Sequence, residues 1–195
     1  MRRALLIPIL LVFAAAVPGA QSRPVPQQQR QFDIENELER LPTYGVFDFL
    51  RFDYDRGKVT LAGYSYQGGL KSHAENAVKR VPGVDDVDNQ IELLPASPND
   101  DRIRWATFYR IYNDSSLSRY SPGGEMGARY ELNQASRFPG TQPFGIYPIH
   151  IIVKNGRTTL MGIVGSEMDR RIAEIRARDV TGVFAVENEL LVDSE

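Results

Sequence analysis

The residue types that most often carry chemistry in proteins are scarce in this chain. It has no cysteine, which excludes disulfides, thiolate catalysis and cysteine-based zinc sites. Its two histidines, His73 and His150, have no partner at the spacing of a metal site. Ser166 lacks a Gly-x-Ser-x-Gly elbow, and its spacing to Asp169 is typical of a helix cap. The sequence therefore predicts a protein that is not an enzyme and that needs no cofactor and no metal.

The best remaining candidate for a cation site is a short acidic stretch that contains Asp85, Asp86 and Asp88. It lacks the glycine and the distal glutamate of a calcium loop, so a solvated turn is the better interpretation. The stretch lies in an acidic first half of the chain, whereas the second half is Arg-rich and nearly balanced. The formal net charge of −2 argues against nucleic acid as a partner.

The elements that would position any site come as two copies of one unit, residues 57–89 and residues 156–188, which align without a gap. Such a duplication predicts two similar domains. We expect the shared glycines to shape turns and strand ends, since no helix follows them as a phosphate-binding loop requires. We expect the shared asparagines, disfavoured in strands, to bond a nearby backbone group. These matched residues are Gly57, Gly63, Gly83 and Asn89 in the first copy and Gly156, Gly162, Gly182 and Asn188 in the second.

Each copy has the pattern of strand, hairpin, strand, helix and strand, with another helical stretch before it. In the second copy, apolar residues alternate over 149–153, and Asn155-Gly156 predicts a two-residue hairpin turn. A helix with an apolar face then runs from Ser166 and ends at Gly182. We expect an α+β fold of two tandem αββαβ domains, each a small mixed three-stranded sheet with two helices on one face.

The N-terminal residues 1–20 have the pattern of a secretory signal peptide. Arg2 and Arg3 precede an apolar run that is short for a bilayer span, and small residues follow it. An uncleaved anchor is the alternative. Residues 21–30, rich in Gln and Pro, predict a polar linker without structure. The first domain then covers 31–95 and the second 99–195, and we expect a periplasmic or extracellular chain with no membrane span after cleavage.

The repeated pattern resembles the BON domain family. The residues that carry the resemblance are Val59, Leu61, Gly63, Ala74, Val81, Gly83, Val84, Val87 and Asn89, then Leu160, Gly162, Ala173, Val180, Gly182, Val183, Val186 and Asn188. The resemblance implies a bacterial envelope protein without catalytic activity, one that binds phospholipid membranes or supports envelope integrity under stress. The chain departs from lipid-anchored members in having no cysteine after the apolar run, and from the family in a long insertion at about 114–147.

The helix expected over 102–112 is both basic and aromatic. Arg102 and Arg104 are interspersed with Trp105, Tyr109 and Tyr112. Such a helix could lie at a membrane interface, where aromatic rings sit at headgroup level and arginine meets anionic lipid. In the alternative, one apolar stripe packs on its own sheet and the other on the insertion or the first domain.

The insertion at 114–147 is the second candidate surface. It is rich in Gly and Pro and places aromatic residues near Arg119 and Arg129. Long insertions without regular structure often carry function. It could meet lipid headgroups or a protein, or could instead be a flap over the second core. We therefore expect a non-catalytic exported protein that binds anionic membrane phospholipid, and the alternative is a protein-protein interaction module that recognises an envelope protein.

Overall fold

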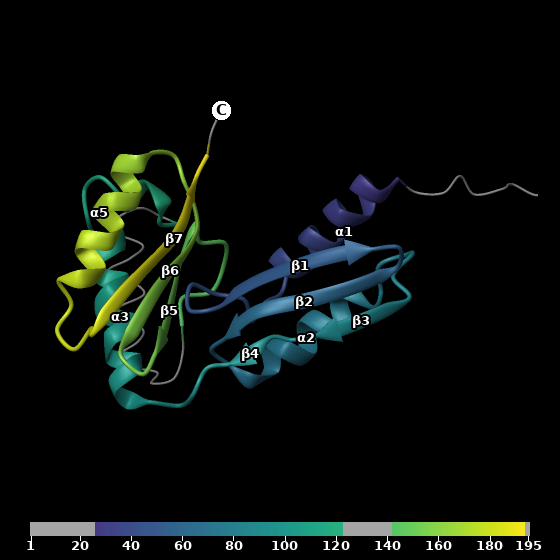
Figure 1. Cartoon of the computed structure of the whole chain (residues 1–195), viewed down its shortest axis with the longest axis horizontal. Coiled ribbons are helices and arrows are strands. Elements are labelled where there is room, and N and C mark those ends of the chain that lie inside the picture. Colours follow the sequence, from purple (N-terminus) through teal and green to yellow (C-terminus); the bar gives the residue numbers. More distant parts are fainter. Residues whose placement is uncertain (1–25, 123–141, 194–195) are drawn as a thin grey trace, which may run out of the picture.

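The structure is a computed structural model that describes residues 26–122 and 142–193 (Figure 1). The predicted signal peptide at 1–20, most of the insertion and Arg129 lie outside the described residues. Two α+β domains follow each other along the chain, which confirms the expected fold class. The first contains α1 (Gln27–Glu39), β1 (Phe49–Asp55), β2 (Lys58–Ser65), α2 (Gly68–Val78), β3 (Asp86–Asn89) and β4 (Glu92–Leu93). The second contains α3 (Pro98–Tyr112), the 3-10 turn η1 (Ser118–Tyr120), β5 (Ile149–Lys154), β6 (Arg157–Val164), α5 (Glu167–Arg178) and β7 (Ala185–Val192).

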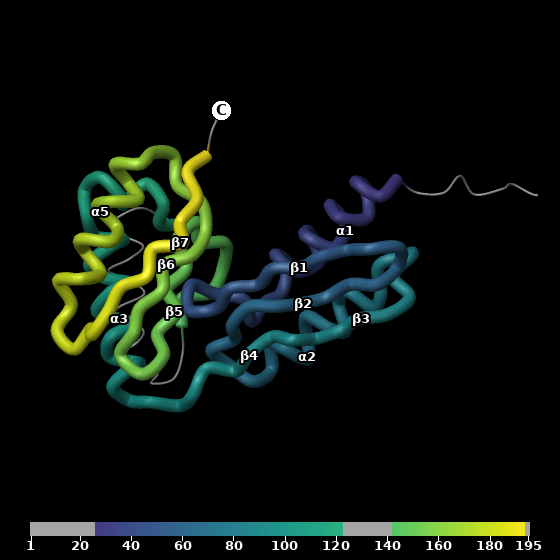
Figure 2. The backbone as a smooth tube through the Cα atoms, in the orientation of Figure 1, coloured from purple at the N-terminus to yellow at the C-terminus, as the bar shows by residue number. Residues whose placement is uncertain are grey.

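The two sheets have the same topology. β1 pairs antiparallel with β2 and β5 with β6, and each hairpin partner then pairs in parallel with the last strand of its copy. The turn residues have positive φ, 53° and 73° at Asn155 and Gly156, as two-residue hairpins require. The last strand is continuous in the second domain. In the first it is divided into β3 and β4, which both pair with β2 (Figures 1 and 2).

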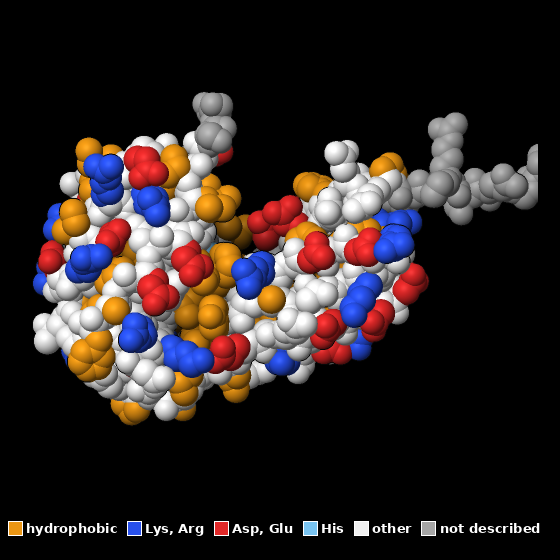
Figure 3. All heavy atoms as spheres, viewed as in Figure 1, with side chains coloured by type: hydrophobic (Ala, Val, Ile, Leu, Met, Phe, Trp, Pro, Cys, Tyr) orange, Lys and Arg blue, Asp and Glu red, His pale blue; other side chains and the backbone are white. Residues whose placement is uncertain are grey.

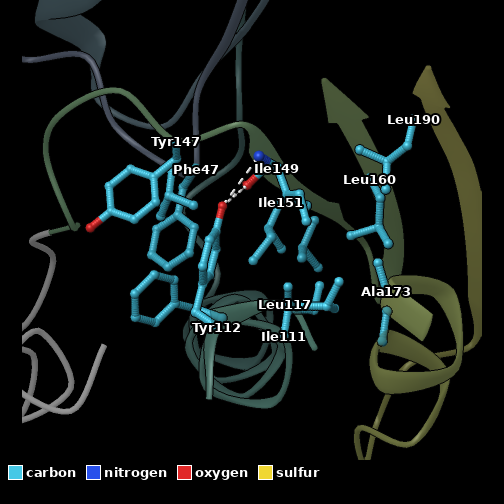
Figure 4. Close-up of a cluster of buried hydrophobic side chains, with 14 of the residues drawn as sticks. Phe47, Ile111, Tyr112, Leu117, Tyr147, Ile149, Ile151, Leu160, Ala173 and Leu190 are labelled. Carbon is cyan, nitrogen blue, oxygen red and sulfur yellow. Dashed lines mark hydrogen bonds between the residues drawn. The ribbon is translucent and has the colours of Figure 1, made fainter. Parts of the chain in front are cut away.

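Both helices of each domain cover one face of its sheet, because the alternating strands place their apolar residues on that side. In the first domain Ile34 and Leu38 of α1 meet Leu61 of β2 and Ala74 of α2. In the second, Figure 4 shows the side chains of β5, β6 and α5 closing over α3. The fully buried residues of this second core include Ile111, Leu117, Ile149, Ile151, Leu160 and Ala173.

The predicted polar linker at 21–30 is wrong at its end, because α1 begins at Gln27. Glutamine is a good helix former, and Pro26 precedes the first turn, where its missing N–H is not needed. Arg30 fixes this turn to the sheet, since its guanidinium donates to the hydroxyl of Tyr54 at 3.0 Å. A long-range bond of this kind cannot be seen in the Gln-rich composition.

The two asparagines make the backbone bonds that the repeat predicted. Asn188 donates to the carbonyl of Arg170 at 2.9 Å and accepts from the N–H of Leu190 at 3.3 Å. Asn89 makes the same two bonds with Lys71 and Ile91, at 2.9 and 3.3 Å. Each side chain therefore ties the helix of its copy to the last strand.

We expect Asn188→Ala to lower the free energy of unfolding by about 1–3 kcal/mol, because it leaves partly buried backbone groups without a partner. Asn89→Ala should cost a similar amount, since its contacts are the same. Urea unfolding would measure both. The control is Asn36→Ala, which removes only an exposed bond to Phe32 and should change stability by less than about 0.5 kcal/mol. Equal effects of all three substitutions would contradict the structural role.

The domains are joined by more than the linker between them. The docking segment, residues 43–48, leaves α1 and enters the second domain, where Val46 and Phe47 are fully buried in the core. Val46 accepts a hydrogen bond from the N–H of Ile151 at 2.8 Å and donates to the carbonyl of Pro143 at 3.0 Å. The ring of Phe47 lies among second-domain side chains in Figure 4. The first domain thus contributes part of the core of the second.

Candidate functional site

The basic aromatic helix α3 does not expose all of the residues that were predicted to contact lipid. Arg104 is fully buried. Its guanidinium donates to the carbonyl of Val153 at 2.5 Å, pairs with Asp101 at 2.5 Å and lies 5.0 Å from the ring centre of Tyr66. The prediction that Arg104 meets lipid is therefore wrong, since the pairing and stacking hold its charge inside the protein.

Tyr112 is also fully buried, so its predicted role at a membrane surface is wrong as well. Its hydroxyl donates to the carbonyl of Ile149 at 2.5 Å and accepts from the N–H of the same residue at 3.2 Å (Figure 4). A buried tyrosine needs a partner for its hydroxyl, and here the partner is a strand.

The outer edge of β5 explains both burials. Across a two-residue hairpin, alternate residues direct their N–H and C=O away from the partner strand. These groups would be buried without partners here, which is costly. The partners are Tyr112 for Ile149, Val46 for Ile151 and Arg104 for Val153. Two polar side chains of α3 and the docking segment therefore seal this edge.

Trp105 and Tyr109 are half-buried on α3. The indole of Trp105 meets the ring of Phe47 edge to face, with centroids 5.3 Å apart, and that of Phe108 at 5.7 Å. This is the alternative arrangement, in which the second stripe of the helix packs on the first domain.

Arg119 belongs to η1, and its guanidinium contacts the first turn of α5. It pairs with Asp169 at 2.5 Å, and the hydroxyls of Tyr120 and Ser166 donate to the same carboxylate. Burial alone would raise the pKa of Asp169, but these hydrogen bonds from Ser166, Tyr120 and Arg119 lower it below its ordinary value. Ser166 caps α5 by accepting from the N–H of Asp169 at 3.2 Å, as its spacing predicted. Arg119 thus has a structural partner.

Arg102 is exposed and lies at what we call the tip, formed by the hairpin turn 154–157, the loop 181–184 and Arg102 itself. Its guanidinium donates to the carbonyl of Thr181 at 3.2 Å. Phe184, 82% exposed, donates its N–H to the carbonyl of Gly156 at 2.9 Å. Its ring covers Gly156 so closely that a Cβ there would lie 2.4 Å away. The exposed Arg157 follows directly, so the tip combines an aromatic ring with two arginines.

Sequence reasoning missed the tip, although the repeat contained a signal for it. Position 184 is equivalent to position 85, and Asp85 stands where the second copy has Phe184. An aromatic residue in a turn where the other copy carries a charge is not needed for the shared fold.

A groove of about 940 Å³ separates the domains. One wall is the edge strand β1 with Glu35 and Glu39 of α1, and the other is the face of the second sheet opposite its helices. That face carries Ile163 and Leu191, both largely exposed, and Ile146 lies beside them. Figure 3 shows hydrophobic side chains in the hollow between the two lobes, with charged groups at its rim.

Two buried titratable groups lie where the docking segment meets the second domain. Asp48 accepts from the N–H groups of Gly45 and Tyr66, at 2.9 and 2.7 Å, and from the amide of Gln142 at 2.5 Å. Burial raises the pKa of Asp48 to about 6, against these hydrogen bonds. His150 lies 3.2 Å from the hydroxyl of Tyr44, and burial lowers the pKa of its imidazole to about 4.

Within the ranges 26–122 and 142–193, no group of three or more His, Asp or Glu side chains could hold a metal ion. None of the helices described is long and apolar enough to cross a membrane.

Comparison with known proteins gives one family. The family model described as "BON domain" matches residues 33–95 and 135–194. No curated protein matches this chain at a significant level. Among solved structures, one similar chain is the C-terminal domain of CdsD, titled the structural protein of the type III secretion system of Chlamydia trachomatis. It is 18% identical and covers 87% of this chain and 100% of its own, with a TM-score of 0.29. A second CdsD structure from the same organism is 17% identical and covers 85% of this chain and 94% of its own, with a TM-score of 0.27.

Proposed function

This chain belongs to the BON domain family, with two copies in tandem, and from that premise we propose that it is an exported envelope protein that binds anionic phospholipid through the tip of its second domain. Members of this family are generally non-catalytic modules that bind phospholipid or protein at the envelope. We further propose that residues 1–20 direct export and are removed, that the domains extend over 31–95 and 99–195, and that lipid binding supports envelope integrity under stress.

The observation that carries the lipid proposal is the exposure of Phe184 beside two arginines. An aromatic ring that is 82% exposed in water has a favourable place at headgroup depth. Arg102 and Arg157 would approach the anionic headgroups at the same time, each contributing about 1 kcal/mol near a charged surface. The tip is small, so we expect weak binding that depends on charge.

The difference between the two tips would orient the protein on the membrane. The equivalent residues of the first domain, 55–58 and 82–85, carry Asp55 and Asp85 against Arg56 and Lys58, and Asp85 replaces the aromatic ring. These charges cancel, whereas the second tip has Lys154, Arg157 and Arg102 and no carboxylate among the same residues, so an anionic surface attracts the second tip more strongly. Only one of the two tips therefore suits a membrane.

Co-sedimentation with vesicles would test this proposal. We expect the purified protein to bind vesicles that contain phosphatidylglycerol, to leave pure phosphatidylcholine vesicles unbound, and to dissociate at high salt because mobile ions screen the arginines. Phe184→Ala should reduce the bound fraction at least threefold, and Arg102→Gln combined with Arg157→Gln should abolish binding.

Matched controls come from α5 of the same domain. Met168 is 63% exposed, and Met168→Ala should leave binding unchanged. Arg171→Gln removes one exposed charge away from the tip and should have little effect. No binding to the anionic vesicles would overturn the lipid proposal, and equal losses for Phe184→Ala and Met168→Ala would overturn the assignment to the tip.

A further inference from the structure

The two domains differ at the outer edge of their first strand. In the second domain the outward N–H and C=O of Ile149, the N–H of Ile151 and the C=O of Val153 all have partners. The equivalent residues in the first domain, 99 positions earlier, are Leu50, Phe52 and Tyr54. β1 has the same pairing register and the same two-residue turn, so these three residues also direct their N–H and C=O groups outward.

Among the described residues, the edge of β1 is more open than that of β5. The hydroxyl of Tyr44 lies near the N–H of Leu50. In the described part of the chain, the outward N–H and C=O of Phe52 have no hydrogen-bond partner. Open strand edges are templates for pairing with another chain, and proteins usually cover or blunt them. The partly apolar, uncovered edge of β1 is therefore a candidate site for pairing with another chain.

The interdomain groove runs along this open edge. Leu50 and Phe52 line it, with Glu35 and Glu39 of α1 on one side and Ile163 of the second sheet on the other. Its volume of about 940 Å³ is at the upper end of the range for ligand pockets, about 300–1,000 Å³. The groove therefore has room for several residues of an extended chain.

A turn of the docking segment already bonds the matching edge of β5. Val46 of the docking segment lies along the edge of β5 and bonds Ile151, and the neighbouring Phe47 enters the apolar core. The groove continues this interface, since Tyr44 and His150, which join the domains, also line it. A turn of the chain therefore covers the first strand of one copy, and the matching strand of the other copy borders an open groove.

We propose that the open edge of β1 binds an extended segment of a partner protein, which adds to the first sheet as an extra strand. Successive side chains of such a strand point to opposite sides. Those facing the second domain would meet Ile163 and Leu191 and should be apolar. Those facing α1 would meet Glu35 and Glu39 and should be basic. This site is separate from the tip, and the proposal does not depend on lipid binding.

A strand suits the groove better than a lipid chain does. The edge offers N–H and C=O groups that need complementary backbone groups, and a hydrocarbon chain has none to offer. Added strands gain affinity from main-chain hydrogen bonds and specificity from alternate side chains.

A nine-residue peptide of alternating Lys and Val, capped at both ends, is the probe for this site. We expect it to bind the purified protein and to shift the backbone amide NMR signals of Leu50 and Phe52. Exchange of the Phe52 amide hydrogen should slow at least tenfold. A peptide of alternating Glu and Val should bind at least tenfold more weakly, because Glu35 and Glu39 repel it. Failure of the Lys-Val peptide to bind would overturn the proposal.

Two further measurements separate strand addition from simple apolar contact. Two variants of the peptide carry N-methyl groups on the backbone amides, one at the odd-numbered residues and one at the even-numbered residues. Both keep all of their side chains. One set should weaken binding at least tenfold and the other by less than about twofold, because only alternate amides face β1. Ile163→Asp should also weaken binding at least tenfold. Ile175→Asp is the control, since Ile175 on α5 is equally exposed, 54% in both cases. Equal effects of the two methylation patterns, or of the two aspartates, would overturn strand addition at this groove.

Discussion

Replacing Phe47 with alanine is expected to destabilise the second domain by about 3–5 kcal/mol, although Phe47 lies between α1 and β1 of the first domain. Its ring is fully buried and meets Trp105, Tyr66 and Phe108 edge to face, at centroid distances of 5.3, 5.7 and 6.4 Å. Truncation would leave a cavity inside this aromatic cluster, and rigid helix and sheet neighbours can fill it only in part.

Urea unfolding followed by two probes would measure this effect. Trp105 is the single tryptophan of the chain and lies against Phe47, so its fluorescence reports on the docked second domain. Circular dichroism reports on both domains. We expect the two transitions to coincide in the wild type and to separate in Phe47→Ala, with fluorescence changing at lower urea. The core of the first domain does not contain Phe47, so that domain should unfold later.

Phe32→Ala is the control for this experiment, because Phe32 is 59% exposed on α1 and should contribute less than about 0.5 kcal/mol. If Phe47→Ala cost no more than Phe32→Ala, or if the wild-type transitions were already separate, the docking segment would not couple the domains.

The repeat made most of the fold predictable. Two copies of the same glycine and asparagine positions identified the hairpins, the helix ends and the bonds of Asn89 and Asn188, because those features depend on residues close in sequence. The docking segment was not predictable in this way. Residues 43–48 are too short to show a period, and nothing local tells which of two cores Phe47 enters.

The candidate site was predicted less well, for a related reason. Arg104 and Tyr112 occur on an aromatic helix where arginine and tyrosine usually indicate a wet surface. Their polar atoms instead satisfy the edge of β5, a need that arises only when the strand and the helix are packed together. Phe184 was the reverse case: it was not among the predicted site residues, and its exposure depends on the closed hairpin beneath it.

The contributions of two buried groups, His150 and Asp48, to the stability of the wild-type protein are expected to cancel between about pH 4 and pH 6. The native pKa of His150 is about 4, below its ordinary value of 6.5. At His150 the native state therefore binds fewer protons than the unfolded chain in this interval. The contribution of His150 to stability is present above pH 6.5 and lost as the pH falls to 4. Asp48 is the opposite case, with a native pKa of about 6 against an ordinary 3.8. Its contribution is present below pH 3.8 and lost as the pH rises through 6.

The two contributions are similar in size. The pKa of His150 changes by 6.5 − 4 and that of Asp48 by 6 − 3.8, and one unit corresponds to 1.36 kcal/mol, so each contributes about 3 kcal/mol. Asp48→Asn leaves the histidine unopposed. We expect its free energy of unfolding, relative to wild type, to fall by about 2 kcal/mol from pH 6 to pH 4, because titration is incomplete at both ends of this interval. His150→Gln leaves the aspartate unopposed, and the same relative quantity should rise by about 2 kcal/mol over the same interval.

Urea unfolding of Trp105 fluorescence at pH 4, 5, 6 and 7 would measure these differences. Comparison with wild type removes the contribution of carboxylates such as Asp114 and Asp169, whose lowered pKa values are common to all three proteins. Asp53→Asn, an exposed change on β1, is the control and should run parallel to wild type. Parallel profiles for Asp48→Asn and His150→Gln would contradict the burial of these groups at the docked interface, because opposite slopes follow only if both are held away from water.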